Sequence, residues 1–406
     1  MAEPARGFTR RPLAAAPLTL MRICILTTDN REHLRNYELR EPQFGPAIEA
    51  ILQGLASQPG VEVHVISCTQ RPMKSPEKIA DNTWFHLLHA SKFGWLRTGY
   101  QGCIRAIRRK VRELRPDIVH GQGTERECAL SAVFSGFPNV VTIHGNMAQV
   151  EKHVRARFGG YYWLAARLEN FALPRTGGVF CNSAYTESIV RPRARRTWRV
   201  ANALRADFFN APAAAVRSPR PVLLNIGSVC TYKRQLELLE IAERLHGEGF
   251  DFEMQFIGAA DSADPYAARF LRRIHDAAGK GFAGYLGTKP AAEVIAAMDA
   301  ASALIHVPSE EAFGLVVAEA LARNLKFFGT DIGGIRDIAS GVDGAELFAL
   351  EDRDALQAAI AAWLRAGSPR PTAAAGEMRR RYHPEVIARR HIEIYHEVLA
   401  GAVPNP

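Results

Sequence analysis

The chain has 406 residues, which is too long for one ordinary core and makes two domains the default interpretation. Hydrophobic residues make up 47% and charged residues 23%, as in ordinary soluble globular proteins, and no stretch approaches the about 20 consecutive apolar residues of a membrane helix. The formal net charge of +9 favours anionic partners, such as nucleotides, phosphates, lipid headgroups or nucleic acid, without choosing among them.

The N-terminus and the cysteines set the context of the fold. Residues 1–20 carry arginines before a short apolar run that Pro17 interrupts, so we expect a disordered extension and not a cleaved signal. Six cysteines are scattered without a C-x-x-C pair, which argues against a zinc site and against a disulfide framework. We therefore expect a reducing compartment and a cytoplasmic location.

Strands and helices alternate in the first half of the chain. We expect strands at 22–27, 61–67, 116–120, 140–144 and 178–183, with helices near 48–55, 100–114, 164–173 and 185–190. This order predicts a parallel sheet. His120 and His144 each end a strand, at the edge where open α/β sheets bind ligands.

Residues 82–115 are rich in aromatic side chains and arginine. A helix at 100–114 would place its apolar residues on one face and most of its basic residues elsewhere. One interpretation is a helix packed on the core with a solvated basic face. The other is peripheral contact with an anionic membrane surface, where each basic residue adds about 1 kcal/mol.

The second half begins after a segment rich in alanine and proline, at 211–221, that indicates a linker. Strands are expected at 222–228, 252–258, 282–287, 303–307 and 326–330, and helices after 234, at 293–298 and after 314. A final helix is expected at about 384–399. No repeat of 20 to 50 residues is visible, which argues against a solenoid fold.

The stretch 303–321 carries the strongest functional signal. A buried strand ends at Pro308, a loop follows, and apolar residues recur at helical spacing after Gly314. The free N–H groups and the dipole at a helix start favour an anion such as phosphate, and glycine permits its close approach. Glu311 and Glu319 bracket this start and suit sugar hydroxyls on either side of a phosphate. The simpler interpretation is a first-turn acid and a solvated acid.

Several segments together resemble family 4 of the retaining glycosyltransferases. They are Pro308-Ser309, Glu311-Ala312-Phe313-Gly314-Leu315, Glu319-Ala320, Gly333-Gly334, Thr142-Ile143-His144 and the turn Val200-Ala201-Asn202-Ala203. The resemblance covers residues 21–400 and implies the GT-B fold, an α/β architecture of two Rossmann-like domains whose parallel sheets face each other across a cleft. Ala312 stands where the family usually has glycine, and Ser228 stands where it usually has arginine.

The resemblance also implies the domain limits. Residues 1–20 would form the N-terminal extension, 21–203 the acceptor-side domain, and 204–385 the domain that binds the nucleotide sugar. Residues 386–406 would form a C-terminal helix that packs back on the first domain, followed by a tail.

The resemblance implies a role for each site residue. His144 would face the transferred sugar, and Glu311 would bind its hydroxyls, so these two are the expected catalytic residues. Glu319 would bind the ribose. The diphosphate would be held by the amides of the Phe313-Gly314-Leu315 turn and by Lys233, with Arg234 supplying a second charge in place of the arginine that Ser228 replaces. Gly45 lies where the family carries a glycine-rich loop facing the nucleotide sugar.

The expected reaction is transfer of a sugar, with retention, from a nucleoside-diphosphate sugar to a hydroxyl of a polysaccharide or lipid-linked intermediate. No Asp-x-Asp or H-E-x-x-H pattern occurs, so we expect no cofactor and no metal requirement. Nucleic acid is not an expected partner, since aromatic and basic residues form no recognisable module. Three alternatives stay open: a GT-B phosphorylase, a nucleotide-sugar epimerase, and a catalytically silent nucleotide-sugar-binding protein.

Overall fold

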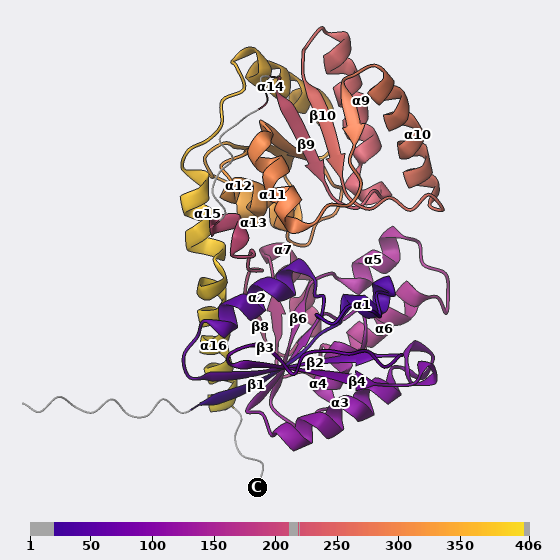
Figure 1. Cartoon of the computed structure of the whole chain (residues 1–406), viewed down its shortest axis with the longest axis vertical. Helices are drawn as coiled ribbons and strands as arrows, with labels where there is room; N and C mark the ends of the chain where they lie inside the picture. The colour runs from indigo at the N-terminus through magenta and orange to yellow at the C-terminus, as the bar shows by residue number, and fades with distance from the viewer. Residues whose placement is uncertain (1–19, 211–217, 219, 402–406) are drawn as a thin grey trace, which may run out of the picture.

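The strands of the chain form two separate sheets, one above the other in Figure 1. The computed structural model describes residues 20–210, 218 and 220–401. The predicted N-terminal extension, apart from Leu20, and most of the predicted linker lie outside the described residues.

The first sheet has the order β3-β4-β2-β1-β5-β6-β7-β8, and only β3 runs antiparallel to its neighbour among the described strands. Its central strands carry fully buried aliphatic residues such as Ile23 and Val65. Such strands need helices packed on both faces, as is usual for a parallel sheet. Its strands are β1 (Met21–Leu26), β2 (Val61–Thr69), β3 (Lys78–Ala80), β4 (Thr83–His89), β5 (Ile118–Gln122), β6 (Asn139–Ile143), β7 (Val179–Cys181) and β8 (Thr197–Arg199). The sequence interpretation missed β3, β4 and β8, and it assigned the residues of β4 only to an aromatic and basic segment.

Helices cover both faces of this sheet. The α-helices are α1 (Asn30–Leu34), α2 (Pro46–Ala56), α3 (Gln101–Leu114), α4 (Glu127–Val133), α5 (Met147–His153), α6 (Tyr161–Ala172) and α7 (Ala184–Val190). Short 3-10 turns lie at η1 (Lys92–Gly94), η2 (Leu96–Thr98) and η3 (Arg191–Arg193). The apolar face of α3 is buried in the core, and its arginines at 105, 108, 109 and 112 are exposed.

The second sheet is parallel throughout, with the order β11-β10-β9-β12-β13-β14. This is the doubly wound order in which ligands bind beyond the carboxyl ends of the strands, where the winding reverses. The strands are β9 (Val222–Ile226), β10 (Glu253–Ile257), β11 (Ala283–Tyr285), β12 (Ala303–His306), β13 (Lys326–Thr330) and β14 (Ala345–Phe348).

The helices of the second half surround this sheet, and the last one leaves it. They are α8 (Asp207–Asn210), η4 (Thr231–Lys233), α9 (Gln235–Gly247), α10 (Pro265–Gly279), α11 (Ala291–Ala300), α12 (Leu315–Ala322), α13 (Gly333–Ala339), α14 (Arg353–Arg365), α15 (Ala374–Tyr382) and α16 (Pro384–Gly401). Figure 1 shows α16 descending from the second sheet to the first, where Ile387, Ile394 and Tyr395 join the core of the first sheet. No helix among the described residues has the length and apolar character needed to cross a bilayer.

Two contacts fix α16 on the first domain. The Tyr395 hydroxyl and a ring nitrogen of His120 lie 2.6 Å apart, and the other ring nitrogen of His120 lies 2.7 Å from the Thr142 hydroxyl. The strand-end histidine at 120 is therefore a buried structural residue. In addition, Gly54 of α2 lies directly against the backbone of Pro384 at the start of α16.

We predict that Gly54→Ala destabilises the protein, because the added methyl group would lie 2.2 Å from the carbonyl oxygen of Pro384. Forced overpacking of this kind costs roughly 1–3 kcal/mol, to be measured as a loss in the free energy of unfolding in urea. Gly247→Ala at the end of α9 is the matched control, since nothing lies within 4 Å of its added methyl group. Equal stability of the two variants would contradict the close packing of α2 on α16.

Candidate active site

A cleft of about 600 Å³ lies between the two sheets, where the carboxyl ends of their central strands meet. Thr27 and Thr28 follow β1, Gln122 ends β5, and His144 follows β6. From the second sheet come the turn Gly227-Ser228 after β9 and the loop after β12. The winding of each sheet thus brings residues distant in sequence to one place.

Nine of the ten predicted site residues line this cleft. They are Gly45, His144, Ser228, Lys233, Glu311, Phe313, Gly314, Leu315 and Glu319. Gly45 lies at the first turn of α2, and the Phe313-Gly314-Leu315 turn lies at the start of α12. The structure therefore gathers residues that the sequence interpretation could associate only by resemblance.

Arg234 is the exception, and its predicted role needs correction. It has left-handed backbone geometry (φ 57°) at the start of α9. Its guanidinium donates to the carbonyl of Leu350 (3.0 Å) and lies 3.7 Å from the carboxylate of Glu237. It lies in a different pocket from the cleft residues, so it does not supply the second cation there.

The N-terminus of α12 opens into the cleft without a side-chain cap. Gly314 takes a left-handed conformation (φ 96°), which glycine adopts without strain. Only the amides of residues 317 and 318 are bonded back to the Gly314 carbonyl, as in any first helical turn. The preceding amides and the helix dipole therefore form a site suited to an anion.

Glu311 lies next to this helix end as an ionised group. Its carboxylate is 2.5 Å from the Lys233 ammonium and 3.3 Å from a ring nitrogen of His306. Burial alone would raise the pKa of Glu311, but Lys233 and His306 together outweigh it and bring the pKa to about 2. Glu311 therefore carries a full negative charge at any physiological pH.

His144 faces Glu311's side of the cleft from the first sheet as a neutral ring. Burial lowers the pKa of His144 to about 4, and a hydrogen bond with Asn202 opposes this only in part. One ring nitrogen lies 3.0 Å from the Gln122 side-chain oxygen. A neutral imidazole in this position can exchange hydrogen bonds with hydroxyl groups without adding charge.

Glu319 lies within α12, and its partner and the direction of its pKa shift both differ from those of Glu311. Burial raises the pKa of Glu319 to about 7, and Arg205 at 3.5 Å offsets only part of this effect. Arg205 also lies 3.5 Å from Glu49 and lines the cleft. Sequence reasoning missed Arg205, because it belongs to no motif and only tertiary contacts place it here.

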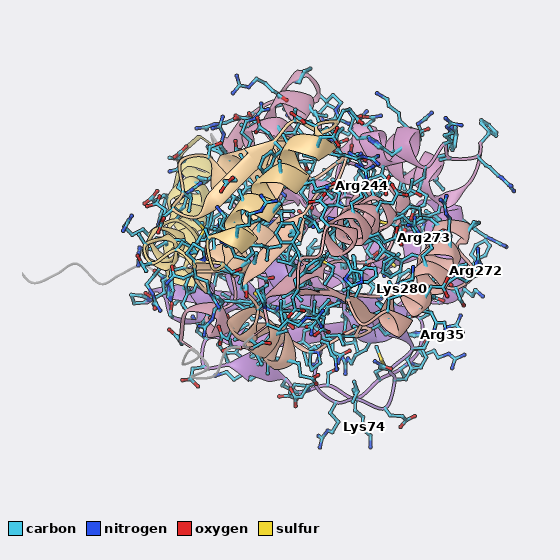
Figure 2. The ribbon with its side chains drawn as sticks, turned by 90° about the horizontal axis from the view of Figure 1, so that it is seen from above. Arg35, Lys74, Arg244, Arg272, Arg273 and Lys280 are labelled. Atoms are coloured by element: carbon cyan, nitrogen blue, oxygen red, sulfur yellow. The ribbon has the colours of Figure 1, made fainter. Side chains whose placement is uncertain are left out.

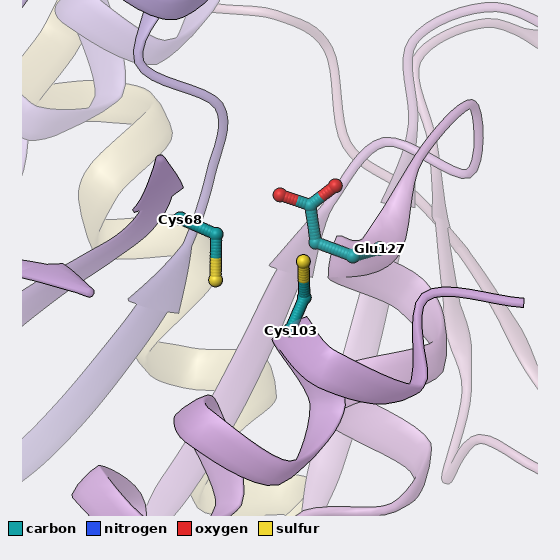
Figure 3. Close-up of side chains that lie close together, drawn as sticks. All are labelled: Cys68, Cys103 and Glu127. Carbon is teal, nitrogen blue, oxygen red and sulfur yellow. The ribbon is translucent and has the colours of Figure 1, made fainter. Parts of the chain in front are cut away.

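One group of metal-capable side chains occurs in the described part of the chain, and it lies away from the cleft. The ligand atoms of Cys68, Cys103 and Glu127 are all within 4.8 Å of one another, and all three residues are buried. Figure 3 shows the two sulfur atoms close together below the Glu127 carboxylate. Cysteine spacing did not reveal this cluster, since its members come from β2, α3 and α4. Glu127 also lies 3.5 Å from Arg126, and all six cysteines are free thiols.

Two parallel α/β sheets of this kind, with a cleft between their carboxyl edges, define the GT-B glycosyltransferases. Solved structures of that class superpose on almost the whole chain. Sucrose-phosphate synthase from Thermosynechococcus elongatus gives a TM-score of 0.72 at 16% identity, covering 94% of this chain and 100% of that chain. Anabaena HepE in complex with UDP gives 0.65 at 12% identity, covering 93% and 100%. The apo lipopolysaccharide outer core galactosyltransferase WaaB gives 0.64 at 14%, covering 93% and 100%.

The family assignment comes from sequence profiles of the two halves. The profile of Glycosyltransferase Family 4 matches residues 47–232, and that of Glycosyl transferases group 1 matches residues 220–366. The chain belongs to family 4 of the GT-B glycosyltransferases. No curated protein sequence matches it.

We predict that Glu319 makes the protein less stable as pH rises. Its pKa in the folded protein, about 7, exceeds the ordinary carboxyl value of 4.5, so the unfolded chain releases this proton first. The stabilisation is complete below about pH 4.5 and disappears as pH rises to about 7. Between pH 5 and pH 8, the free energy of unfolding of the wild type should fall by on the order of 2 kcal/mol relative to Glu319→Gln.

Urea titrations of both proteins at the two pH values measure this difference. Glu293→Gln is the matched control, because Glu293 is an exposed acid on α11 that pairs with Lys289. A constant difference between wild type and Glu319→Gln would show that Glu319 is charged throughout this range.

Proposed function

We propose that this glycosyltransferase moves a sugar from a nucleoside-diphosphate sugar to an acceptor hydroxyl with retention of configuration. The observation that carries the proposal is the uncapped start of α12 between two acids, Glu311 with its pKa lowered and Glu319 with its pKa raised. An anion at the helix start would leave Glu311 on one side and Glu319 on the other. That arrangement suits a diphosphate with a hexose at one end and a ribose at the other.

Groups of the donor would take the place of contacts that the side chains of the cleft make with one another. Its diphosphate would lie on the Gly314 and Leu315 amides and draw the Lys233 ammonium from Glu311, which is then free to accept from sugar hydroxyls. Ribose hydroxyls would donate to Glu319, and Arg205 would favour the charged form of that carboxylate. Structures of HepE, a similar protein, contain UDP and UDP-glucose, which supports a nucleotide sugar as donor.

The chemical step would break the bond between the anomeric carbon and the diphosphate oxygen and form a bond from that carbon to the acceptor oxygen. The acceptor's proton would pass to the departing phosphate, on the same face of the sugar. Glu311 would lie beside the positive charge that develops on the sugar, and Lys233 with the helix dipole would stabilise the negative charge that develops on the leaving group. The protein's contribution is thus positioning and fixed charge.

On the acceptor side we propose a glycan or lipid-linked intermediate, met at the inner face of a membrane. The exposed arginines of α3 and the exposed Phe93 support peripheral contact with an anionic surface. One observation distinguishes the proposed transferase from the phosphorylase, epimerase and silent-binding alternatives. Release of free nucleoside diphosphate only when acceptor is present excludes all three.

We predict that one member of a nucleotide-sugar panel stabilises the protein in a thermal-shift assay, since a ligand at 100 times its Kd adds about 2.7 kcal/mol. With that donor, Glu311→Ala should lower turnover by at least about 100-fold, because a fixed charge beside the reacting carbon is lost. Donor affinity should change far less.

Glu293→Ala, which removes an exposed acid outside the cleft, is the control and should leave turnover unchanged. Unchanged turnover in Glu311→Ala would remove the catalytic role proposed for this residue. A panel in which no nucleotide sugar stabilises the protein would contradict the donor class itself.

Metal independence is a further prediction of the proposed mechanism. The cleft already supplies one ammonium and a helix dipole for the diphosphate, so turnover in excess EDTA should match turnover without it. Activity that vanishes in chelator and returns only with manganese would contradict the prediction.

A further inference from the structure

A second and larger cavity lies in the first domain beside the cleft, and we call it the side basin. Its volume is about 1130 Å³, against about 600 Å³ for the cleft. Glu125 lines both cavities, so they meet at this residue. Segments from α1, the loop after β2, η1, the loop before α4 and the starts of α5 and α6 form its walls.

Cations dominate the walls of the side basin, which contains Arg35, Arg71, Lys92 and Arg126. Arg35, Arg71 and Lys92 form no ion pair with any acid of the described residues. Glu32, one of the two acids present, already accepts hydrogen bonds from the Thr69 hydroxyl (2.8 Å) and the Gln70 amide (3.1 Å). The basin therefore has uncompensated positive charge.

A buried ion pair holds the two loops that carry Arg35 and Arg71 in place. Arg31 is fully buried, and its guanidinium donates to Asp29 (2.5 Å). The same group donates to the carbonyls of Leu39 (2.8 Å) and Lys74 (3.0 Å), one from each loop. Figure 2 shows Arg35 and Lys74 extending outward from these loops. Because removing one partner of a buried pair costs about 3–5 kcal/mol, the loops are fixed before any ligand arrives.

Aromatic rings orient two of the basin's cations. The Arg71 guanidinium lies 5.0 Å from the ring centre of Tyr37, and that of Arg126 lies 4.8 Å from the ring centre of the buried Trp95. Stacked guanidinium groups keep their N–H edges free for planar oxygen acceptors such as phosphate. Tyr161 and Tyr162 line the same basin and offer rings on which a sugar can lie.

We propose that the side basin binds an acceptor that carries a phosphate or diphosphate, with its reacting hydroxyl directed at Glu125 and the cleft. This inference rests on the glycosyltransferase function proposed above. Glu125 fits the junction, because its side-chain oxygen Oε2 is buried without a hydrogen-bond partner and can accept from a hydroxyl. A cavity of this size holds a phosphorylated mono- or disaccharide. Soluble sugar phosphates and lipid-linked sugar diphosphates share this chemistry.

Titration with inorganic pyrophosphate, in the presence of a saturating nucleotide sugar, tests the anion site directly. The variant Arg35→Gln/Arg71→Gln should raise the Kd for pyrophosphate at least about tenfold, since two charge-assisted contacts are lost. The control Arg269→Gln/Arg272→Gln removes the same charge from exposed positions on α10 and should leave it unchanged. The thermal shift caused by the nucleotide sugar should be equal in all three proteins, which also shows that each is folded.

Unchanged pyrophosphate affinity in the basin variant, or no pyrophosphate binding to wild type, overturns the inference while leaving the donor assignment intact. If instead no nucleotide sugar binds to the wild type, the proposed function fails, and with it the identity of the basin as an acceptor site.

Acceptor assays then separate the two sources of phosphate. Glucose 6-phosphate is compared with glucose, and N-acetylglucosamine on a short prenyl diphosphate with methyl N-acetylglucosaminide, each by release of nucleoside diphosphate. The phosphorylated member of at least one pair should have a KM about tenfold lower, and the basin variant should abolish that difference. Equal KM values within both pairs, or a difference that survives in the basin variant, would contradict the proposal.

Discussion

The contact between α7 of the first domain and the loop before α12 sets the geometry of the cleft. The Ser183 hydroxyl donates to the carbonyl of Ala312 (2.6 Å), and the Ala184 amide donates to the Asp337 carboxylate (2.5 Å). The two bonds join the start of α7 to the loop before α12 and to α13 of the second domain, and α16 connects the two domains again at the side. The loop that carries Glu311 is therefore held by the opposite domain, and any rotation of one domain on the other moves it relative to the first sheet.

Charge in the cleft is balanced internally, which explains how several ionised groups share a small space. Lys233 neutralises Glu311, and Arg205 offsets part of the desolvation of Glu319. A diphosphate would exchange the ion pair of Lys233 with Glu311 for one of Lys233 with a phosphate oxygen, and the α12 amides would bind the rest of its charge. The side basin differs, because Arg35, Arg71 and Lys92 have no acidic partner among the described residues, so an anion could bind them without first breaking an ion pair.

The sequence predicted the residues of the cleft well for a physical reason. Each lies within a few residues of a strand end or a helix start, as His144 follows β6 and Gly314 precedes α12. Parallel sheets bring such ends to one edge whatever the intervening chain does. The prediction for Arg234 failed because its motif indicated the backbone position but not the side-chain direction, and its guanidinium donates to the Leu350 carbonyl instead of lining the cleft. Arg205 and the cysteine cluster depended on contacts between distant elements, for which local pattern holds no signal.

One of the two departures from the family pattern has a local structural account. Ala312 does not have a left-handed backbone, so a methyl group is tolerated where glycine is usual, and its carbonyl still accepts from Ser183. Ser228 lines the cleft but brings no charge, and Arg234 does not replace the missing arginine. Under the proposed function, Lys233 and the α12 amides would bind the diphosphate without help from Arg234, which would give the helix dipole a large share of donor binding.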